Sequence, residues 1–288
     1  MISLSDNITY KKLLIKYTNS ASRFMVIDGA MIHYRDEGSG YPILLIHGSF
    51  SSLHTFNAWA NELSLHYRVI RLDLQGFGLS DPREYIENPV EEFKSLLTRF
   101  LNILGVYNCH IAGSSLGGWI AWEFALAYPE RIKKLVLIDA AGYLDKDNIP
   151  LPFKMAQAPF AGSMMRMALR RDLIEYFIKQ VYADASKIST QLIDRYYELF
   201  MRKGNPEAFI SLVNARYKDH SLHLKHLQTP TLILWGEADK WLGIKNAYRF
   251  EKDIPFAELI TYPNVGHVPM EEIPEKSVHD VIRFLNKK

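Results

Sequence analysis

Short apolar runs alternate with longer amphipathic runs along most of this 288-residue chain. The short runs have the length and the Val, Ile and Leu content of β-strands, and several are apolar on both faces, as strands covered by helices on both sides must be. They span residues 24–27, 31–34, 43–47, 68–72, 110–113, 135–138, 231–235 and 259–262. The longer runs have helical spacing and span residues 56–65, 89–104, 116–127, 244–252 and 275–285. This alternation predicts an α/β fold with a mostly parallel sheet and right-handed crossovers.

The alternation stops between residues 141 and 222, where no strand-like run occurs. Apolar side chains recur in this region at helical spacing, which predicts a helical cap inserted over the strand ends. We expect residues 1–140 and 223–288 to form the core, with 1–22 as an N-terminal helical extension and 141–222 as the cap. The apolar residues that indicate the cap are Met155, Met164, Met165, Met167, Leu173, Tyr176, Phe177 and Leu192.

The composition excludes several classes of protein. With 48% hydrophobic and 23% charged residues, the chain can bury a core and is not intrinsically disordered. Lys and Arg total 34 against 32 for Asp and Glu, and no long basic run stands out, so we expect no nucleic-acid binding. The single cysteine, Cys109, has apolar neighbours and no disulfide partner in the chain, which favours a buried thiol.

The N-terminal region indicates where the protein resides. It lacks a basic segment followed by an apolar run, and nowhere do ~18 apolar residues follow one another, so we expect a cytoplasmic protein. A helix capped by Ser5 or Asp6 is predicted to dock on the protein's own surface. Weak association with a membrane surface is the alternative, and it would make the location peripheral. The helix is indicated by Tyr10, Leu13, Leu14 and Tyr17, with Lys11, Lys12 and Lys16 nearby.

The strongest motif is Gly113-Ser114-Ser115-Leu116-Gly117, which lies where a strand-like run gives way to a helical run. This is the G-x-S-x-G pattern of a nucleophile elbow, in which a tight turn presents the serine hydroxyl at the end of a strand. Glycines two residues before and after the serine relieve crowding in such a turn. The motif predicts Ser115 as a nucleophile, and a structural Gly/Ser turn is the alternative.

A serine hydroxyl needs a base, and His267 is the best candidate because it lies late in the chain on a loop after a strand-like run. Three other histidines, His220, His223 and His226, are spaced by three residues. No acidic or thiol ligand supports them in the sequence, so we expect no metal site there.

The acid that orients the base should follow a strand between the nucleophile and the base. Asp239 meets this condition at the end of the run 231–235, and it completes the chain order Ser, Asp, His. Asp139 follows another strand-like run and is the main rival, while Glu237 is less favoured. We therefore predict Asp239 as the acid and a structural role for Asp139.

A tetrahedral oxyanion needs hydrogen-bond donors fixed in advance. The segment His47-Gly48-Ser49-Phe50 follows a strand-like run in the order expected for that role. We predict that the backbone N–H of Leu116 and that of Ser49 or Phe50 form the oxyanion hole. Because backbone groups do this work, His47 is expected to be structural, and a plain strand-to-loop turn is the alternative for the whole segment.

Taken together, these features resemble the α/β-hydrolase superfamily over nearly the whole chain. Within it, four segments resemble the bacterial lipase and esterase branch related to dehalogenases and epoxide hydrolases. These segments are Tyr34-Arg35-Asp36-Glu37-Gly38, Asp73-Leu74-Gln75-Gly76-Phe77-Gly78-Leu79, Gly117-Gly118-Trp119 and Gly266-His267-Val268-Pro269. Dehalogenases and epoxide hydrolases of this superfamily use aspartate at the elbow, so Ser115 argues against both activities.

The resemblance implies a cap between the sixth and seventh core strands, no metal and no organic cofactor. It also suggests hydrolysis of a small-molecule carboxylic ester. The Met- and Phe-rich insertion indicates an adaptable apolar pocket, which favours esters of short or medium acyl length. Two alternatives are a carbon–carbon bond hydrolase acting on a ring-cleavage product and a non-catalytic ligand-binding protein on the same fold. The oligomeric state is not predicted by any of these motifs.

Overall fold

One eight-stranded sheet forms the centre of the protein, in the strand order β1-β2-β4-β3-β5-β6-β7-β8. The computed structural model describes residues 9–144, 149–158 and 170–287. β1 and β2 are antiparallel to their neighbours, and every pairing from β4 through β8 is parallel, which confirms the predicted α/β architecture. The strands are β1 (Ser22–Ile27), β2 (Ala30–Glu37), β3 (Pro42–Ile46), β4 (Arg68–Leu72), β5 (Cys109–Ser114), β6 (Ile132–Ile138), β7 (Thr231–Gly236) and β8 (Ala257–Tyr262).

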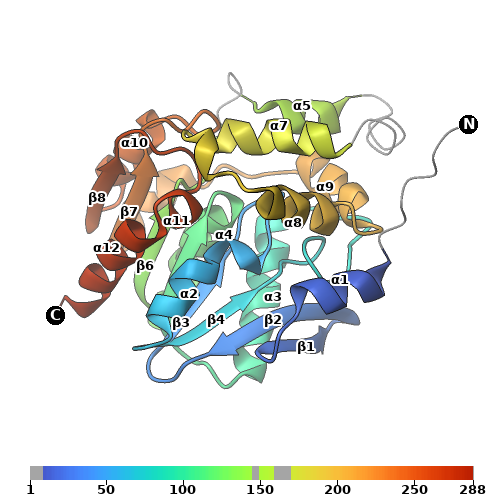
Figure 1. The fold of residues 1–288 in the computed structure, drawn as a ribbon. Coiled ribbons are helices and arrows are strands. Elements are labelled where there is room, and N and C mark those ends of the chain that lie inside the picture. Colours follow the sequence, from blue (N-terminus) through green and yellow to red (C-terminus); the bar gives the residue numbers. More distant parts are fainter. Residues whose placement is uncertain (1–8, 145–148, 159–169, 288) are drawn as a thin grey trace, which may run out of the picture.

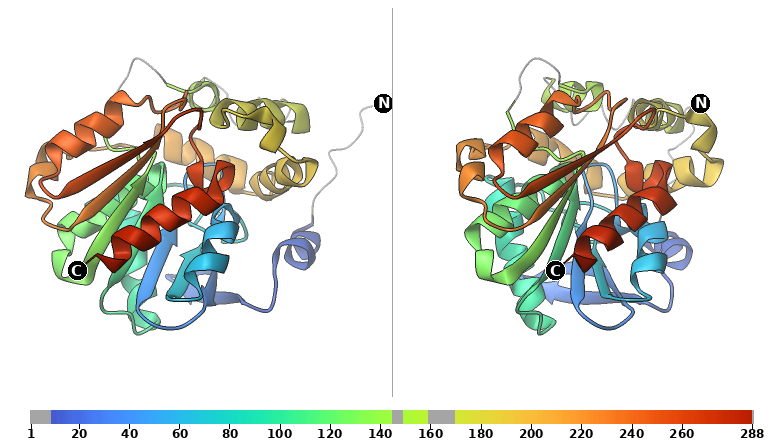
Figure 2. Two further views of the ribbon diagram at one scale, coloured as in Figure 1. Left: turned by 60° about the vertical axis from the view of Figure 1, so that its left-hand side comes forward. Right: turned by 90° about the vertical axis from the view of Figure 1, so that its left-hand side faces the viewer.

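Helices cover both faces of this sheet (Figures 1 and 2). α2 (Asn57–Leu63) and α12 (Pro274–Asn286) lie on one face, and α3 (Pro89–Ile103), α4 (Leu116–Ala127) and α10 (Lys245–Asp253) lie on the other. All residues of β5 are buried, as are residues 116–125 of α4, because these two elements lie between other layers. Burial on all sides explains why both segments are largely apolar rather than amphipathic. The turn between β5 and α4 is therefore held by the most buried part of the fold.

The segment between β6 and β7 is helical, and its helices lie above the carboxyl ends of the parallel strands (Figure 1). They are α5 (Leu151–Gln157), α7 (Arg171–Val181), α8 (Thr190–Phe200) and α9 (Asn205–Asn214), with short 3₁₀ turns at Ala185–Lys187 and Ser221–His226. Four of the predicted apolar cap residues pack on the main core: Met155, Leu173, Phe177 and Leu192. Met164, Met165 and Met167 lie outside the described residues. We propose residues 141–222 as the extent of the cap.

The N-terminal helix α1 (Tyr10–Tyr17) docks on the protein itself. Leu13 and Tyr17 are buried against Leu79 and Leu199, and the Tyr17 hydroxyl donates to Glu198 at 2.7 Å. The helix begins at Tyr10 after Thr9, which provides no side-chain cap, whereas the predicted caps Ser5 and Asp6 lie outside the described residues.

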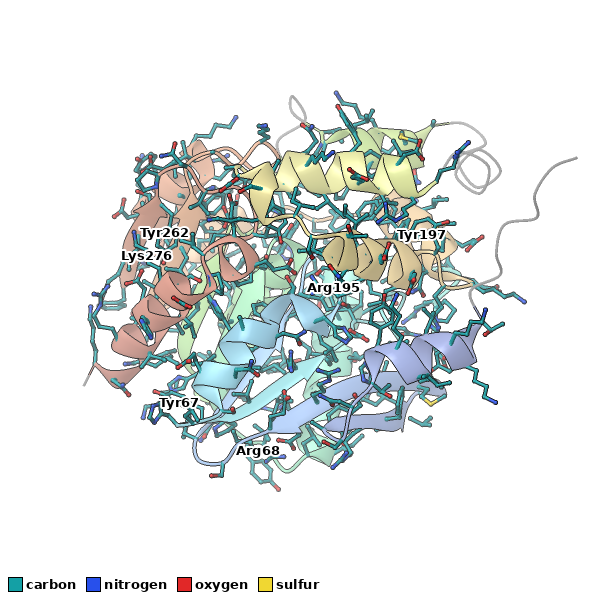
Figure 3. The ribbon with its side chains drawn as sticks, in the orientation of Figure 1. Tyr67, Arg68, Arg195, Tyr197, Tyr262 and Lys276 are labelled. Atoms are coloured by element: carbon teal, nitrogen blue, oxygen red, sulfur yellow. The ribbon has the colours of Figure 1, made fainter. Side chains whose placement is uncertain are left out.

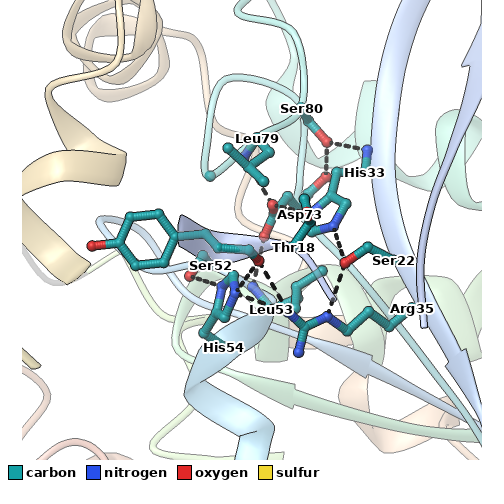
Figure 4. A network of polar contacts seen from close by, with 12 residues as sticks. Thr18, Ser22, His33, Arg35, Ser52, Leu53, His54, Asp73, Leu79 and Ser80 are labelled. Carbon is teal, nitrogen blue, oxygen red and sulfur yellow. Dashed lines mark hydrogen bonds and ion pairs between the residues drawn. The ribbon is translucent and has the colours of Figure 1, made fainter. Parts of the chain in front are cut away.

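Polar groups from the core hold the end of α1 (Figure 4). The Tyr17 carbonyl accepts hydrogen bonds from Arg35 at 3.0 Å and from His54 at 2.9 Å. Both donors belong to the network around Asp73, whose carboxylate also accepts from the backbone N–H of Leu53 and Leu79. Docking therefore uses the apolar stripe of α1, and membrane association stays a prediction. Among the described helices, none is both long and apolar enough to cross a bilayer.

Candidate active site

Ser115 occupies a strained turn between β5 and α4. Its φ is 53° and its ψ is −118°, a region that L-residues rarely adopt. Glycines on both sides are required by space: a Cβ on Gly113 would lie 2.1 Å from the Gly117 carbonyl oxygen, and a Cβ on Gly117 would lie 2.2 Å from the Ile46 oxygen. The structure thus gives the predicted elbow geometry, with the serine at the carboxyl edge of the sheet.

His267 lies on the loop after β8 and is 4% exposed. Its Nδ1 is 2.7 Å from Asp239 Oδ2, while its Nε2 is buried and has no hydrogen-bond partner among the described residues. Ser115 and His267 line the same cavity. The ring nitrogen opposite Asp239 is therefore the one available to a serine hydroxyl or a substrate.

Asp239 is fixed by its own loop. Its Oδ1 accepts the backbone N–H groups of Trp241 at 2.8 Å and Leu242 at 3.0 Å, and its side chain has no exposed surface. Of the rivals, Glu237 accepts from the Thr261 hydroxyl instead. Among the described carboxylates, only Asp239 is hydrogen-bonded to His267.

Asp139 lies beside Asp239 and His267, a proximity that the sequence did not predict. It is fully buried, and it contributes a polar atom to a group with Asp239 and His267 whose atoms all lie within 4.8 Å of one another. The signal was present in the sequence, because Asp139 and Asp239 each follow a strand. Only the observed pairing of β6 with β7 shows that these two strand ends are neighbours.

The predicted oxyanion donors surround the elbow. A Cβ on Gly48 would lie 2.8 Å from the Ser115 Cβ, so the loop with Ser49 and Phe50 passes directly over the serine. Phe50 has a φ of 62°, and among the described residues the N–H groups of Ser49, Phe50 and Leu116 have no protein acceptor. Three free donors beside a serine can stabilise a developing negative charge on a bound carbonyl oxygen.

His47 is bonded as a structural residue. Its Nε2 accepts the Leu74 N–H at 2.9 Å, so its Nδ1 carries the proton and donates to the Gly48 carbonyl at 2.7 Å. Burial lowers the pKa of His47, which keeps the ring neutral. The ring thereby connects the loop after β3 to the loop after β4.

Two apolar cavities meet at Ser115, and Ser49 and Trp241 line both of them. The smaller lies under α7 and is lined by Ile174, Phe177, Ile178, Val181 and Met270. The larger has a volume of about 330 Å³ and is lined by Leu116, Trp119, Phe153, Leu212, Val213 and Leu242. No lysine, arginine or carboxylate belongs to the described lining of either cavity. The site is thus suited to a neutral, largely apolar molecule.

The cap contacts the histidine loop directly. The His267 N–H donates to the Val181 carbonyl at the end of α7, at 2.7 Å. Buried Glu272 accepts the N–H of Gly266 on the loop and that of Asp184 after α7, both at 2.8 Å. The cap therefore helps to set the position of the imidazole.

We expect Gly266→Ala to destabilise the protein by about 1–3 kcal/mol, because the new Cβ would lie 2.3 Å from the Val181 carbonyl oxygen. Urea unfolding measures the loss. Gly243→Ala is the matched control, since a Cβ there meets no atom within 4 Å, and it should change the free energy of unfolding by less than about 0.5 kcal/mol. Equal stability of the two variants would show that Gly266 is not packed tightly against the Val181 carbonyl of the cap.

Two other places in the fold hold potentially reactive groups, the cluster around His220 and the thiol of Cys109, and their surroundings indicate structural roles. His220 lies beside Glu123 and Glu91, but the Lys94 ammonium is 2.7 Å from Glu91 and 3.5 Å from Glu123 and already supplies a positive charge. Cys109 is 1% exposed, and burial raises the pKa of its thiol to about 12, which suppresses the reactive thiolate.

Comparison with known proteins places this geometry in a family. The model of the alpha/beta hydrolase fold matches residues 41–274, a span that contains Ser115, Asp239 and His267. The chain belongs to the α/β-hydrolase fold family and is a hydrolase by that membership.

Relatives with assigned names fall into two groups. A 2-hydroxy-6-oxononadienedioate/2-hydroxy-6-oxononatrienedioate hydrolase of Burkholderia vietnamiensis is 30% identical, with 94% of this chain and 96% of that protein covered. The structure of the meta-cleavage product hydrolase CumD of Pseudomonas fluorescens IP01 superposes with a TM-score of 0.80 at 25% sequence identity. The superposition covers 92% of this chain and 97% of CumD. Lipase 1 of Psychrobacter immobilis is 25% identical in sequence, and the match covers 98% of this chain and 90% of the lipase.

Proposed function

We propose that this protein hydrolyses neutral carboxylic esters through an acyl-enzyme on Ser115. The observation that carries the proposal is the opening of the Ser115 elbow onto two cavities whose described lining holds no cation. The carbonyl carbon of an ester carries an acyl chain on one side and an alkoxy group on the other. The two cavities that meet at Ser115 provide one space for each group. The larger one suits an acyl chain of short or medium length, and the smaller one suits the alcohol.

The chemistry follows from the positions of the polar groups. His267 takes the Ser115 proton as the hydroxyl attacks the carbonyl, and the N–H groups of Leu116 and of Ser49 or Phe50 hold the oxyanion. His267 then protonates the leaving alcohol, and water activated by the same ring releases the acid. Asp239 accepts a hydrogen bond from the Nδ1–H of His267, so it fixes the tautomer and stabilises the imidazolium.

Carbon–carbon bond hydrolysis of a ring-cleavage product is the second candidate, and the names of two of the three relatives favour it. The substrate in the first name is a dicarboxylate, which calls for charge-assisted hydrogen bonds. No arginine belongs to the described lining of either cavity, and two cap arginines already have carboxylate partners. Arg171 is partly exposed and pairs with Asp194, and Arg195 is bound to Glu271 on the inner side of α8 (Figure 3).

The residues next to the predicted acid and base in the sequence also favour ester hydrolysis over carbon–carbon bond hydrolysis. Carbon–carbon hydrolases of this superfamily usually carry an arginine close before the acid and a tryptophan directly after the histidine. Here Glu237 and Ala238 precede Asp239, and Val268 follows His267. Trp241 does lie 5.6 Å from the His267 ring, but it reaches the site from the Asp239 loop. Of the other cap arginines considered as anion partners, Arg170 has an 80% exposed side chain that lies 3.7 Å from Asp172, and Arg166 lies outside the described residues.

The two candidates are separated by a pair of substrates. We expect p-nitrophenyl esters of roughly two to eight acyl carbons to be hydrolysed, with up to ~0.8 kcal/mol gained per buried methylene until the cavity is full. A yellow ring-cleavage dienoate should bleach slowly or not at all. Rapid bleaching of the dienoate without ester hydrolysis would establish the carbon–carbon activity and overturn the proposal.

Blocking the larger cavity tests where the acyl chain binds. We expect Val213→Phe to lower kcat/KM for p-nitrophenyl octanoate by roughly 10- to 100-fold while the acetate ester changes little, since only the longer chain loses buried methylenes. Ile178→Phe, which fills the smaller cavity, is the comparison and should not select against long chains. If Ile178→Phe alone excluded octanoate, the acyl chain would lie under α7.

A further inference from the structure

A second carboxyl group lies beside the predicted triad, at the end of the neighbouring strand. Asp139 directly follows β6 and Asp239 follows β7, and both side chains are fully buried. Polar atoms of the two carboxyl groups and of His267 all lie within 4.8 Å of one another. Two acids therefore share one buried site with the His267 imidazole.

Hydrogen bonds distinguish the two acids. Asp239 accepts three, from His267 Nδ1 and from the backbone N–H groups of Trp241 and Leu242. Asp139 accepts one, from the Gly236 N–H to its Oδ1 at 3.0 Å, and its buried Oδ2 receives none from the described residues. A buried carboxylate needs several donors to remain charged, so Asp239 is the better place for the negative charge.

The surrounding charges act in the same direction. Burial raises the pKa of Asp139 well above its ordinary value, and the negative charge of Asp239, followed by that of Glu272 on α11 (Pro269–Glu272), raises it further. The titratable groups near Asp139 are Asp239, His267, Glu272 and Tyr262. Two carboxyl groups this close do not both ionise readily, and one of them keeps a proton.

We propose that Asp139 is a neutral positioning residue whose O–H donates to the Asp239 carboxylate, and that it becomes the anion beside His267 when Asp239 is removed. The inference rests on the proposed role of Asp239 in orienting His267. In the intact protein, Asp139 connects the Gly236 N–H at the end of β7 to the Asp239 carboxylate. It thus holds the acid in place without adding a second charge to the site.

A double-mutant cycle tests this role through the rate at which a fluorophosphonate labels Ser115, a reaction that needs no ester substrate. Asp139→Asn preserves a neutral donor and acceptor, so it should slow labelling by no more than about 3-fold and leave the midpoint of the pH–rate profile in place. Asp239→Ala should cost roughly 10²-fold, because Asp139 ionises in its stead. The double variant should cost roughly 10⁴-fold, the loss expected when no acid orients the histidine.

The contrary results are equally specific. If Asp139→Asn cost the same factor in both backgrounds, Asp139 would not replace Asp239. If Asp139→Asn alone moved the midpoint of the pH–rate profile down by about one unit or more, Asp139 would carry a charge in the intact protein, and the proposal would be wrong.

Infrared spectroscopy tests the protonated state independently of activity. Wild-type protein at neutral pH should show the C=O stretch of a buried carboxylic acid that Asp139→Asn lacks, and absence of this difference would overturn the neutral state. If labelling and infrared results agree with the cycle while no ester is hydrolysed, only the proposed substrate fails. If wild-type Ser115 does not react with the phosphonate at all, the proposed function and the role of Asp139 in it both fail.

Discussion

Ester turnover by Ser115→Ala should fall by about 10⁴- to 10⁶-fold while the protein stays folded. The substitution removes the oxygen that forms the acyl-enzyme in the proposed mechanism, and it deletes no other heavy atom from a turn whose backbone is fixed by Gly113 and Gly117. The oxyanion donors and both cavities remain, so a small residual rate over water is expected. Initial rates with p-nitrophenyl butyrate measure the loss.

Ser114→Ala is the matched control, because Ser114 directly precedes Ser115 at the end of β5 and its hydroxyl is lost in the same way. It should change turnover only mildly. If the two effects were reversed, Ser114 would be the nucleophile and the assignment of the elbow would be wrong.

Loss of His267 should be as damaging as loss of Ser115, since the two groups act as a unit. We expect His267→Ala to lower kcat by about 10⁴- to 10⁶-fold and to slow phosphonate labelling greatly, because the described lining of both cavities contains no other histidine and no carboxylate that could act as the base. Ser115→Ala, by contrast, should abolish labelling altogether. Stopped assays with ester and phosphonate on the same samples measure both effects.

His279→Ala serves as the control for histidine removal, because His279 is exposed on α12. It should leave turnover and labelling within about 2-fold of wild type. Full activity in His267→Ala would mean that another base serves Ser115.

Much of the fold was predictable because apolar residues recur at different spacings in strands and in helices. The alternating runs predicted all eight strands of the sheet, and the predicted helices end within a few residues of α2, α3, α4, α10 and α12. The elbow was predictable for a local reason: the crowding at Gly113 and Gly117 arises within one turn and from one neighbouring strand. Chain order did not separate Asp239 from Asp139, because both acids follow a strand and lie between Ser115 and His267 in the sequence. The structure distinguishes them, since the carboxylate hydrogen-bonded to His267 is that of Asp239.

Other features depend on contacts between distant segments, which periodicity does not report. The adjacency of Asp139 and Asp239 follows from the pairing of β6 with β7. The bond from His267 to Val181 joins the loop after β8 to the cap. The apolar residues of α1 predicted an amphipathic helix, but only its contacts with Leu79 and Leu199 show where it docks.

The central claim is that an ester carbonyl is attacked by Ser115, and trapping the intermediate tests it most directly. Wild-type protein mixed rapidly with p-nitrophenyl butyrate and quenched in acid should carry one butyryl group, and peptide mapping should locate it on Ser115. Asp139→Asn should carry the same group, and Ser115→Ala should carry none. Turnover of the ester without an acylated serine, or with the acyl group on another residue, would contradict the account.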